Sequence, residues 1–211
     1  MMKVSLIRYT QDADLLAGEA AALCYNGKNP AKSLDRAMAG GHESVTEHAS
    51  CTFLVEGVSR VLLAQITRHR LASFSVQSQR YCGADFDLVI PDSMAIPELV
   101  DDIITAKKVV ADLYTKATGL GVPDEDARYL TFQAGKTTLY ITMNARELRH
   151  FFSLRCCNRA QWEIRDLAWR MLRLCKVAAP ALFADAGPGC VRGRCSEDKP
   201  CGNPYTLVEE E

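Results

Sequence analysis

The sequence has no apolar run long enough to cross a membrane. A spanning helix needs about 18 consecutive apolar residues, and polar or charged residues interrupt every apolar stretch of this chain before that length. A secretory segment would show an apolar core after its first basic residues, and none follows Met1-Met2-Lys3. We therefore expect a cytoplasmic protein that has no membrane partner.

A large excess of one charge is also missing. The chain has 25 Lys and Arg residues against 26 Asp and Glu residues, which gives a formal net charge of −1. A dedicated nucleic-acid binder usually carries a clear excess of basic residues, so we do not expect nucleic acid as the partner. With 211 residues, of which 48% are hydrophobic and 24% charged, the chain can form one globular domain with a substantial core.

Disulfide bonds and metal sites are not expected either. The chain has nine cysteines, an odd number, and thiols stay reduced in the cytoplasm. The spacing of Cys190, Cys195 and Cys201 does not match that of zinc-knuckle ligands. His42 and His48 are not at i and i+4, the spacing that places two imidazoles on one helical face. The sequence therefore predicts no bound metal.

Hydrophobic patterns predict one α+β domain with a mixed or antiparallel sheet flanked by long helices. Strands are expected at 3–8, 51–58, 87–91 and 137–143. Helices are expected at 12–24, from Asn29-Pro30 to Gly40-Gly41, from Ser59 to Arg68, and at 97–118, 123–129, 145–154 and 158–177. Residues 187–211 are rich in Gly, Pro and Cys and are expected to form a tail that extends over the surface.

The stretch from Gln65 to Tyr81 contains no acidic residue, although it includes Arg68, His69, Arg70 and Arg80. A solvated basic surface usually has acidic residues interleaved. Arginine offers a planar fork of donors, to which Ser and Gln add more, and this set suits phosphates and the edges of heterocycles. Either the stretch binds an anionic ligand, or it is a basic loop that meets acidic residues from elsewhere in the chain.

A second polar group is expected on the helix that Asn144 caps. At about 100° per residue, Arg146, His150 and Ser153 fall on one side of this helix, and the opposite side is apolar. Arg155 projects into the middle of the apolar side. Either the helix has ended before Arg155, or the guanidinium lies in a partly dry pocket and requires an anionic or strongly accepting ligand, because burial of an unpaired charge is costly.

These segments resemble the flavin-dependent thymidylate synthases. Arg68-His69-Arg70, followed after seven residues by Ser78-Gln79-Arg80, is similar to the fingerprint of that family. Other blocks are similar to family segments in the same order, namely Gly41–Ser44, Glu47-His48, Gln65, Val122–Arg128, Asn144–Arg146 and Leu154–Glu163. The resemblance covers about residues 1–185. Two positions depart from the family pattern, because Val76 stands where many relatives carry Glu and His150 where some carry Asn.

The resemblance implies a reaction and an assembly. The reaction is the reductive methylation of dUMP to dTMP, with methylenetetrahydrofolate as carbon donor and FAD, reduced by NADPH, as hydride source. The assembly is a homotetramer with shared active sites. Residues 1–186 would form the catalytic domain and 187–211 a separate tail. The alternative is a non-catalytic nucleotide- or RNA-binding module that uses the segment from Arg68 to Arg80.

The resemblance also implies ligand contacts at individual positions. Those implied for FAD are Ser44 (from a neighbouring subunit), Arg68, His69, Arg70, Val76, Asn144, Ala145, Arg146 and His150. Those implied for dUMP are Gln65, Ile66, Thr67, Arg68, Val76, Gln77, Ser78, Gln79, Arg80, Arg128 and Arg155. His42 would lie near the isoalloxazine ring, where folate docks. Arg155 is implied as the catalytic residue, because its guanidinium would stabilise charge on the uracil ring, and no enzyme nucleophile is then required.

Overall fold

The computed structural model describes residues 1–193, 195 and 197–205. Contacts divide the chain into two compact units, and each is described by itself. The first unit comprises Met1–Lys3, Val55–Ile66 and Ser75–Leu139. The second comprises Val4–Leu54, Thr67–Phe74 and Tyr140–Glu211. Residues 194, 196 and 206–211 of the predicted tail lie outside the described residues.

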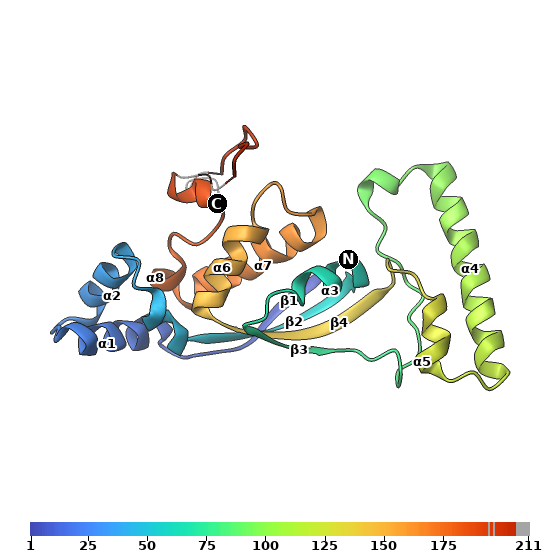
Figure 1. Ribbon diagram of the computed structural model, residues 1–211, viewed down its shortest axis with the longest axis horizontal. Coiled ribbons are helices and arrows are strands. Elements are labelled where there is room, and N and C mark those ends of the chain that lie inside the picture. Colours follow the sequence, from blue (N-terminus) through green and yellow to red (C-terminus); the bar gives the residue numbers. More distant parts are fainter. Residues whose placement is uncertain (194, 196, 206–211) are drawn as a thin grey trace. The chain divides into compact units, whose positions relative to one another are not determined.

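Four strands form one antiparallel sheet in the order β1-β2-β4-β3, which confirms the predicted α+β class. Their bounds are β1 Lys3–Tyr9, β2 Ser50–Ser59, β3 Ala72–Val76 and β4 Lys136–Asn144 (Figure 1). Alternate residues of β2 and β4 are buried, as expected for strands with one face against the core. The hydroxyls of Thr52 and Thr142 lie 2.9 Å apart across this central pair and mark its register.

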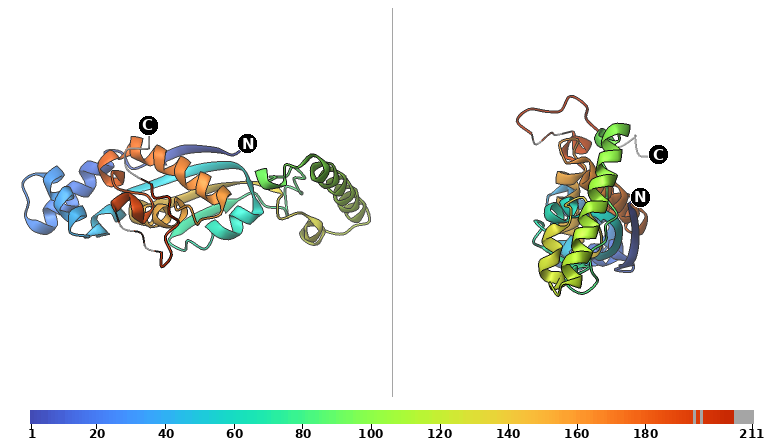
Figure 2. Two further views of the ribbon diagram at one scale, coloured as in Figure 1. Left: turned by 90° about the horizontal axis from the view of Figure 1, so that it is seen from above. Right: turned by 90° about the vertical axis from the view of Figure 1, so that its right-hand side faces the viewer.

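The second unit contains α6 (Ala145–Arg155), which carries the predicted polar residues Arg146, His150, Ser153 and Arg155, and several other helices. The bounds of the other helices are α1 Ala13–Tyr25, α2 Pro30–Ala39, α7 Trp162–Ala178 and α8 Pro180–Phe183. Figures 1 and 2 show α1 beside α2 and α6 beside α7. Two caps are present: Asn29 Oδ1 accepts from the Lys32 amide at 3.1 Å, and Asn144 Oδ1 accepts from the Glu147 amide at 2.9 Å. Asp12, expected to cap α1, makes no side-chain cap hydrogen bond. A short 3₁₀ helix, η1 (Glu43–His48), precedes β2.

The first unit contains α3 (Arg60–Ile66), α4 (Pro97–Gly119) and α5 (Asp124–Ala127), with the 3₁₀ turns η2 (Asp92–Met94) and η3 (Arg128–Leu130). Ser59 Oγ accepts from the Leu62 amide at 3.0 Å and caps α3, as predicted. Helix α4 has its predicted length, but Tyr114 is its only buried residue. Apolar side chains along the rest of α4, including Ile104, Val109 and Leu113, are exposed.

Three other local predictions were wrong. Residues 87–91 form no strand, because only an isolated bridge between Leu88 and Gly135 joins them to a neighbour. Strand β3 lies inside the basic stretch and was not predicted, although Phe74 and Val76 alternate with serines there. The tail is not simply extended, since it contains the 3₁₀ turn η4 (Gly189–Arg192). No described helix is both long enough and apolar enough to span a membrane.

Candidate active site

Three side chains of the second unit form a hydrogen-bonded chain that ends at the predicted catalytic residue. Oε1 of Glu147 lies 3.1 Å from Nδ1 of His69, and Nε of Arg155 lies 3.1 Å from Nε2 of the same ring. A guanidinium has only donors, so Nε2 of His69 must accept and the ring proton must sit on Nδ1, where it donates to the carboxylate. His69 is therefore neutral, and both of its ring nitrogens are in use.

Burial and charge agree with a neutral His69. The side chain is only 6% exposed, and burial is the main reason why its pKa lies below the ordinary value. The hydrogen bond and charge of Glu147 raise the pKa, whereas the charges of Arg155 and His150 lower it. The ring also packs edge-on against Phe151, with 5.0 Å between the ring centroids. This packing fixes the plane of the imidazole.

The question about Arg155 is answered by the extent of α6. The helix continues to Arg155, so it does not end before this residue, and the side chain is half-buried. The ligand that such a pocket would require stays a prediction. Burial lowers the pKa of Arg155, and the positive charge of Arg68 lowers it further. In the part of the chain that is described, Nε is bound to His69, and neither Nη group has a hydrogen-bond or ion-pair partner.

The two arginines that flank His69 also differ from ordinary surface cations. Arg68 and Arg70 are exposed, and no described acidic residue forms an ion pair with either of them. The basic stretch is therefore mixed: His69 meets Glu147 from elsewhere in the chain, whereas Arg68 and Arg70 have no such partner among the described residues. Arg80, at its far end, does have such a partner.

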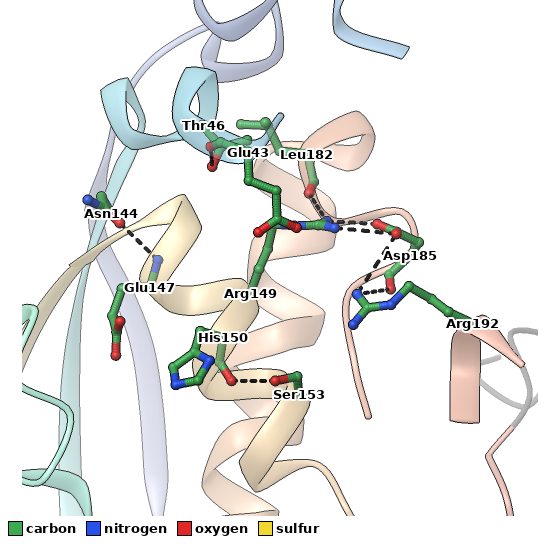
Figure 3. Close-up of polar contacts among 10 residues, drawn as sticks. All are labelled: Glu43, Thr46, Asn144, Glu147, Arg149, His150, Ser153, Leu182, Asp185 and Arg192. Carbon is green, nitrogen blue, oxygen red and sulfur yellow. Dashed lines mark hydrogen bonds and ion pairs between the residues drawn. The ribbon is translucent and has the colours of Figure 1, made fainter. Parts of the chain in front are cut away.

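A cavity of about 670 Å³ opens beside the start of α6. Its lining residues are Glu43, Glu47, Leu71, Asn144, Arg146, Glu147 and His150. Three of the positions predicted for FAD thus meet in one cavity of a volume typical of ligand sites, roughly 300–1,000 Å³. Arg146 forms an ion pair with Glu47, and the side-chain oxygen of Asn144 is used in the helix cap. Ser153 Oγ donates to the His150 carbonyl at 2.8 Å (Figure 3).

Sequence reasoning missed a buried arginine behind this cavity. Arg149 is 4% exposed and donates through Nε to Glu43 Oε1 at 3.2 Å. Its Nη1 donates to the Leu182 carbonyl and to Asp185 Oδ1, both at 2.7 Å, and Nη2 donates to Asp185 Oδ2 at 3.3 Å (Figure 3). Burial would raise the pKa of the Asp185 carboxyl, but hydrogen bonds and charge from Arg149 outweigh burial and lower it. Arg149 thus ties α6 to η1 and to the residues after α8.

The residues predicted to lie near flavin and folate are in η1 and directly before it. Ser44 lies in η1 next to Glu43, and His42 directly precedes it; both are exposed. The Glu43 side chain is bound to Arg149, and its carbonyl accepts from Thr46 Oγ1 at 2.7 Å. The main chain beside Ser44 is therefore held from two sides.

The first unit gathers the residues predicted for the phosphate of dUMP. Arg80 Nη2 lies 2.7 Å from Glu125 Oε2, and Arg128 Nε donates to the Glu125 carbonyl at 3.0 Å. Ser78 Oγ accepts from the Arg80 amide at 3.2 Å. Sequence reasoning did not include Arg60, whose pKa is lowered by burial and then by the charge of Arg128. Its buried Nε has no hydrogen-bond partner among the described residues.

Several other predicted positions are buried or already have hydrogen-bond partners within the chain. Ile66 and Ala145 are buried at 0% and 1% exposure, and the Gln77 amide donates to the Thr138 carbonyl at 3.0 Å. Gln79 is buried, and its Nε2 lies 3.5 Å from Thr131 Oγ1. The remaining predicted positions, Gln65, Thr67 and Val76, are half-buried or exposed.

The tail packs against the connection between α6 and α7. Asn158 Nδ2 donates to the Asn203 carbonyl at 3.0 Å, and the Tyr205 hydroxyl donates to Asn158 Oδ1 at 2.6 Å. The Tyr205 ring lies 4.9 Å from that of Trp169, centroid to centroid. A cavity of about 150 Å³ between the tail and this connection is lined by Cys157, Cys190, Cys195 and Cys201, among others. Across the described residues, no three His, Cys, Asp or Glu side chains converge as a metal site.

Comparison with known proteins assigns the chain to a family. The family model described as thymidylate synthase complementing protein matches residues 5–181. The chain is 46% identical to the flavin-dependent thymidylate synthase of Geobacter sulfurreducens and 40% identical to that of Clostridium tetani, in both cases over 93% of this chain and 91% of the relative. Among solved structures, the UMP/dUMP methylase PolB of Streptomyces cacaoi, bound with 5-Br UMP, has a TM-score of 0.78 and 25% identity over 87% of this chain and 92% of that chain.

The fingerprint resemblance, the fold and these matches agree over nearly the same residues, and the chain belongs to the thymidylate synthase complementing protein family, the family of the flavin-dependent thymidylate synthases.

Proposed function

We propose that the chain catalyses the reductive methylation of dUMP to dTMP and that Arg155 activates the pyrimidine. The observation that carries this proposal is the half-buried guanidinium of Arg155, which neutral His69 holds through Nε while both Nη groups remain for a ligand. Relatives named flavin-dependent thymidylate synthases support the same reaction, because they match nearly the whole chain.

The chemistry requires stabilised negative charge on the uracil ring. The ring carbon that receives the new group reacts poorly until charge on N3, C4 and O4 is stabilised. The half-buried guanidinium of Arg155, with both Nη groups free for a ligand, suits that purpose. Because the neutral His69 ring separates Arg155 from the Glu147 carboxylate, no described carboxylate neutralises the guanidinium directly.

The residues assigned to the phosphate of dUMP follow the family resemblance. Arg80, Arg128 and Ser78 supply donors for a dianion, and Arg60 adds positive charge beside Arg128. The other residues assigned to dUMP are Gln65, Ile66, Thr67, Arg68, Val76, Gln77, Gln79 and Arg155. At Ile66 the contact is through the main chain, since the side chain is fully buried.

FAD is assigned to the cavity at the start of α6 and to the adjacent basic stretch. Asn144, Arg146 and His150 line a cavity of sufficient volume, and exposed Arg68 and Arg70 suit a pyrophosphate. Since Arg146 is already paired with Glu47, the negatively charged part of FAD fits better at Arg68 and Arg70. When bound, FAD supplies the hydride. The remaining FAD positions, Ser44, His69, Val76 and Ala145, and the folate position, His42, rest on the family resemblance, as do methylenetetrahydrofolate and NADPH as co-substrates.

A cytoplasmic homotetramer with shared sites completes the proposal. Its support within the chain is α4, whose apolar side chains Ile104, Val109 and Leu113 are exposed. Such a surface is typical of an interface between copies of a chain. Light scattering coupled to size exclusion measures the assembly directly, and a monomer at micromolar concentration would contradict this part of the proposal.

The experiment is to purify the protein, record its visible spectrum with and without dUMP, and assay dTMP formation with methylenetetrahydrofolate and NADPH. We expect a flavin spectrum that changes on addition of dUMP, and folate-dependent dTMP. Arg155→Ala is expected to retain flavin and lose turnover. Arg173→Ala, which removes an exposed arginine of α7, is the control and is expected to behave as the wild type. A colourless protein that binds RNA with steep salt dependence would favour the alternative of a nucleic-acid-binding module.

A further inference from the structure

Glu147 is a buried acid for which the family resemblance provides no role. Its side chain is 7% exposed, and it occupies the third residue of α6, three after the cap Asn144. In the usual capping box, the acid at this position turns back to the start of its own helix. Here the carboxylate lies against Nδ1 of His69. The helix N-terminus favours a negative charge at this position.

The contact between Glu147 and His69 decides which ring nitrogen can serve Arg155. An ionised carboxylate only accepts hydrogen bonds, so it keeps the ring proton on Nδ1. The lone pair is then on Nε2, where Nε–H of Arg155 donates at 3.1 Å. With the proton on Nε2 instead, two N–H groups would face each other and the hydrogen bond would be lost. His69 can anchor Arg155 in one tautomer only.

Two groups select this tautomer from opposite sides of the ring: Arg155 donates to Nε2, and Glu147 is the acceptor that faces Nδ1. The titratable and charged groups that face the ring are Glu147, His150 and Arg155, all from α6. His150 and Arg155 are cations when charged, and Phe151 contributes only its ring edge. Glu147 is therefore the one acidic group, among the described residues, in contact with the imidazole.

We infer that Glu147 is a positioning residue: through the His69 ring, it holds the Arg155 guanidinium so that both Nη groups are free for the pyrimidine. The inference rests on the proposed function of Arg155 and adds to it the buried acid that keeps Arg155 in place. It also gives His69 a task besides the contact with flavin that the family resemblance implies. Because both ring nitrogens of His69 are hydrogen-bonded within the chain, His69 can contact flavin only through its ring carbons or through its main chain.

The first test is Glu147→Gln, with Glu19→Gln on the exposed side of α1 as the control. In this variant the His69 tautomer is no longer fixed, so Arg155 is no longer held in place. When a group that stabilises the reacting charge is misplaced, turnover falls by about 10- to 100-fold. We expect kcat to fall by that factor, with bound flavin and the unfolding temperature close to the wild-type values. The control is expected to keep wild-type kcat. Glu147→Gln with wild-type turnover would overturn the inference.

A double-variant cycle distinguishes positioning from a general structural effect. In His69→Gln, the amide oxygen can accept from Arg155 whatever stands at position 147. Glu147→Gln added to His69→Gln is therefore expected to change kcat by less than about twofold, which means strong coupling between the two positions. Equal losses from Glu147→Gln in both backgrounds would overturn the inference.

Nitrogen NMR of the His69 ring tests the same inference without turnover, and it remains available if Glu147→Gln folds poorly. The wild-type protein is expected to show the Nδ1–H tautomer, and a wild-type Nε2–H tautomer would overturn the inference. This readout also separates the two proposals. A protein that shows the Nδ1–H tautomer but makes no dTMP contradicts the proposed function and leaves the geometry of Glu147 and His69 intact.

Discussion

Nε of Arg155 donates to Nε2 of His69 at 3.1 Å, although the two residues are 86 positions apart in the chain. The contact uses the single N–H of Nε. It leaves the fork of two Nη groups, which is the geometry that planar acceptors such as a pyrimidine edge require. The first prediction follows from this geometry.

Arg155→Lys is expected to fail although it keeps the charge. Lysine carries one compact ammonium group and no planar fork, so it cannot bind His69 and a pyrimidine edge together. We expect kcat to fall by about 10²- to 10³-fold, the cost of removing a donor to developing charge, while flavin binding persists. Steady-state dTMP formation measures the effect. A lysine variant within threefold of the wild type would show that positive charge alone suffices.

The neutral state of His69 predicts how stability depends on pH. Because burial lowers the pKa of His69 in the folded protein below the ordinary 6.5, the unfolded chain binds the proton more readily than the folded one. The free energy of unfolding therefore decreases as the pH falls below about 6.5, towards the lowered pKa of the folded state. Above that window the contribution is complete.

The measurement is urea unfolding at pH 7.5 and at pH 5.5, for the wild type and for His69→Gln. The wild type is expected to lose more stability between the two pH values than the variant, which has no titratable group at this position. Equal losses would mean that His69 does not stay neutral in the folded protein.

Arg149→Met is expected to be the most destabilising of the simple arginine substitutions in the second unit. The arginine is buried and bound to Glu43, Asp185 and the Leu182 carbonyl, and removal of one partner from a buried ionic group costs about 3 kcal/mol or more. Urea unfolding gives the free energy. Arg170→Ala, which removes only the half-exposed ion pair with Asp166 within α7, serves as control and is expected to cost less than about 0.5 kcal/mol. Similar costs for both variants would contradict the prediction.

Glu125→Gln is expected to strengthen the binding of dUMP. In the described structure Glu125 holds Arg80 in an ion pair of 2.7 Å, with both side chains about half exposed, and a phosphate would have to compete with this carboxylate. Pairs of this kind contribute about 0.2–1 kcal/mol, so release of Arg80 is expected to lower Kd for dUMP by up to about fivefold. Titration of flavin absorbance with dUMP gives the value. Weaker binding would mean that Glu125 itself assists the nucleotide.

The predictions from sequence succeeded where the physical cause is local. The caps at Asn29, Ser59 and Asn144 depend on residues within one helical turn, and all three have side-chain hydrogen bonds. The cap expected at Asp12 was wrong, because this residue has a left-handed backbone conformation and makes no such bond. The unusual direction of Arg155 could also be derived from helical periodicity alone. The identity of the ligand could not, and it came from the family resemblance.

Contacts between distant segments could not be predicted. Arg149 is bound to residues 106 positions before it and 36 positions after it, and no local pattern links those three segments. Likewise, Glu147 looks like an ordinary capping residue until the fold brings His69 beside it. The wrong strand at residues 87–91 has the same origin, since its apolar residues satisfied the local pattern but found only one bridge partner.

The tail binds the segment that follows Arg155, although no residue of the tail is assigned to a ligand. Asn158, which follows Arg155 by three residues, is bound by Asn203 and Tyr205. Two related sequences could therefore agree at every position that touches nucleotide or flavin and still differ in how firmly the end of α6 is supported. The partners of Asn158 are therefore a feature to compare between relatives in addition to the fingerprint.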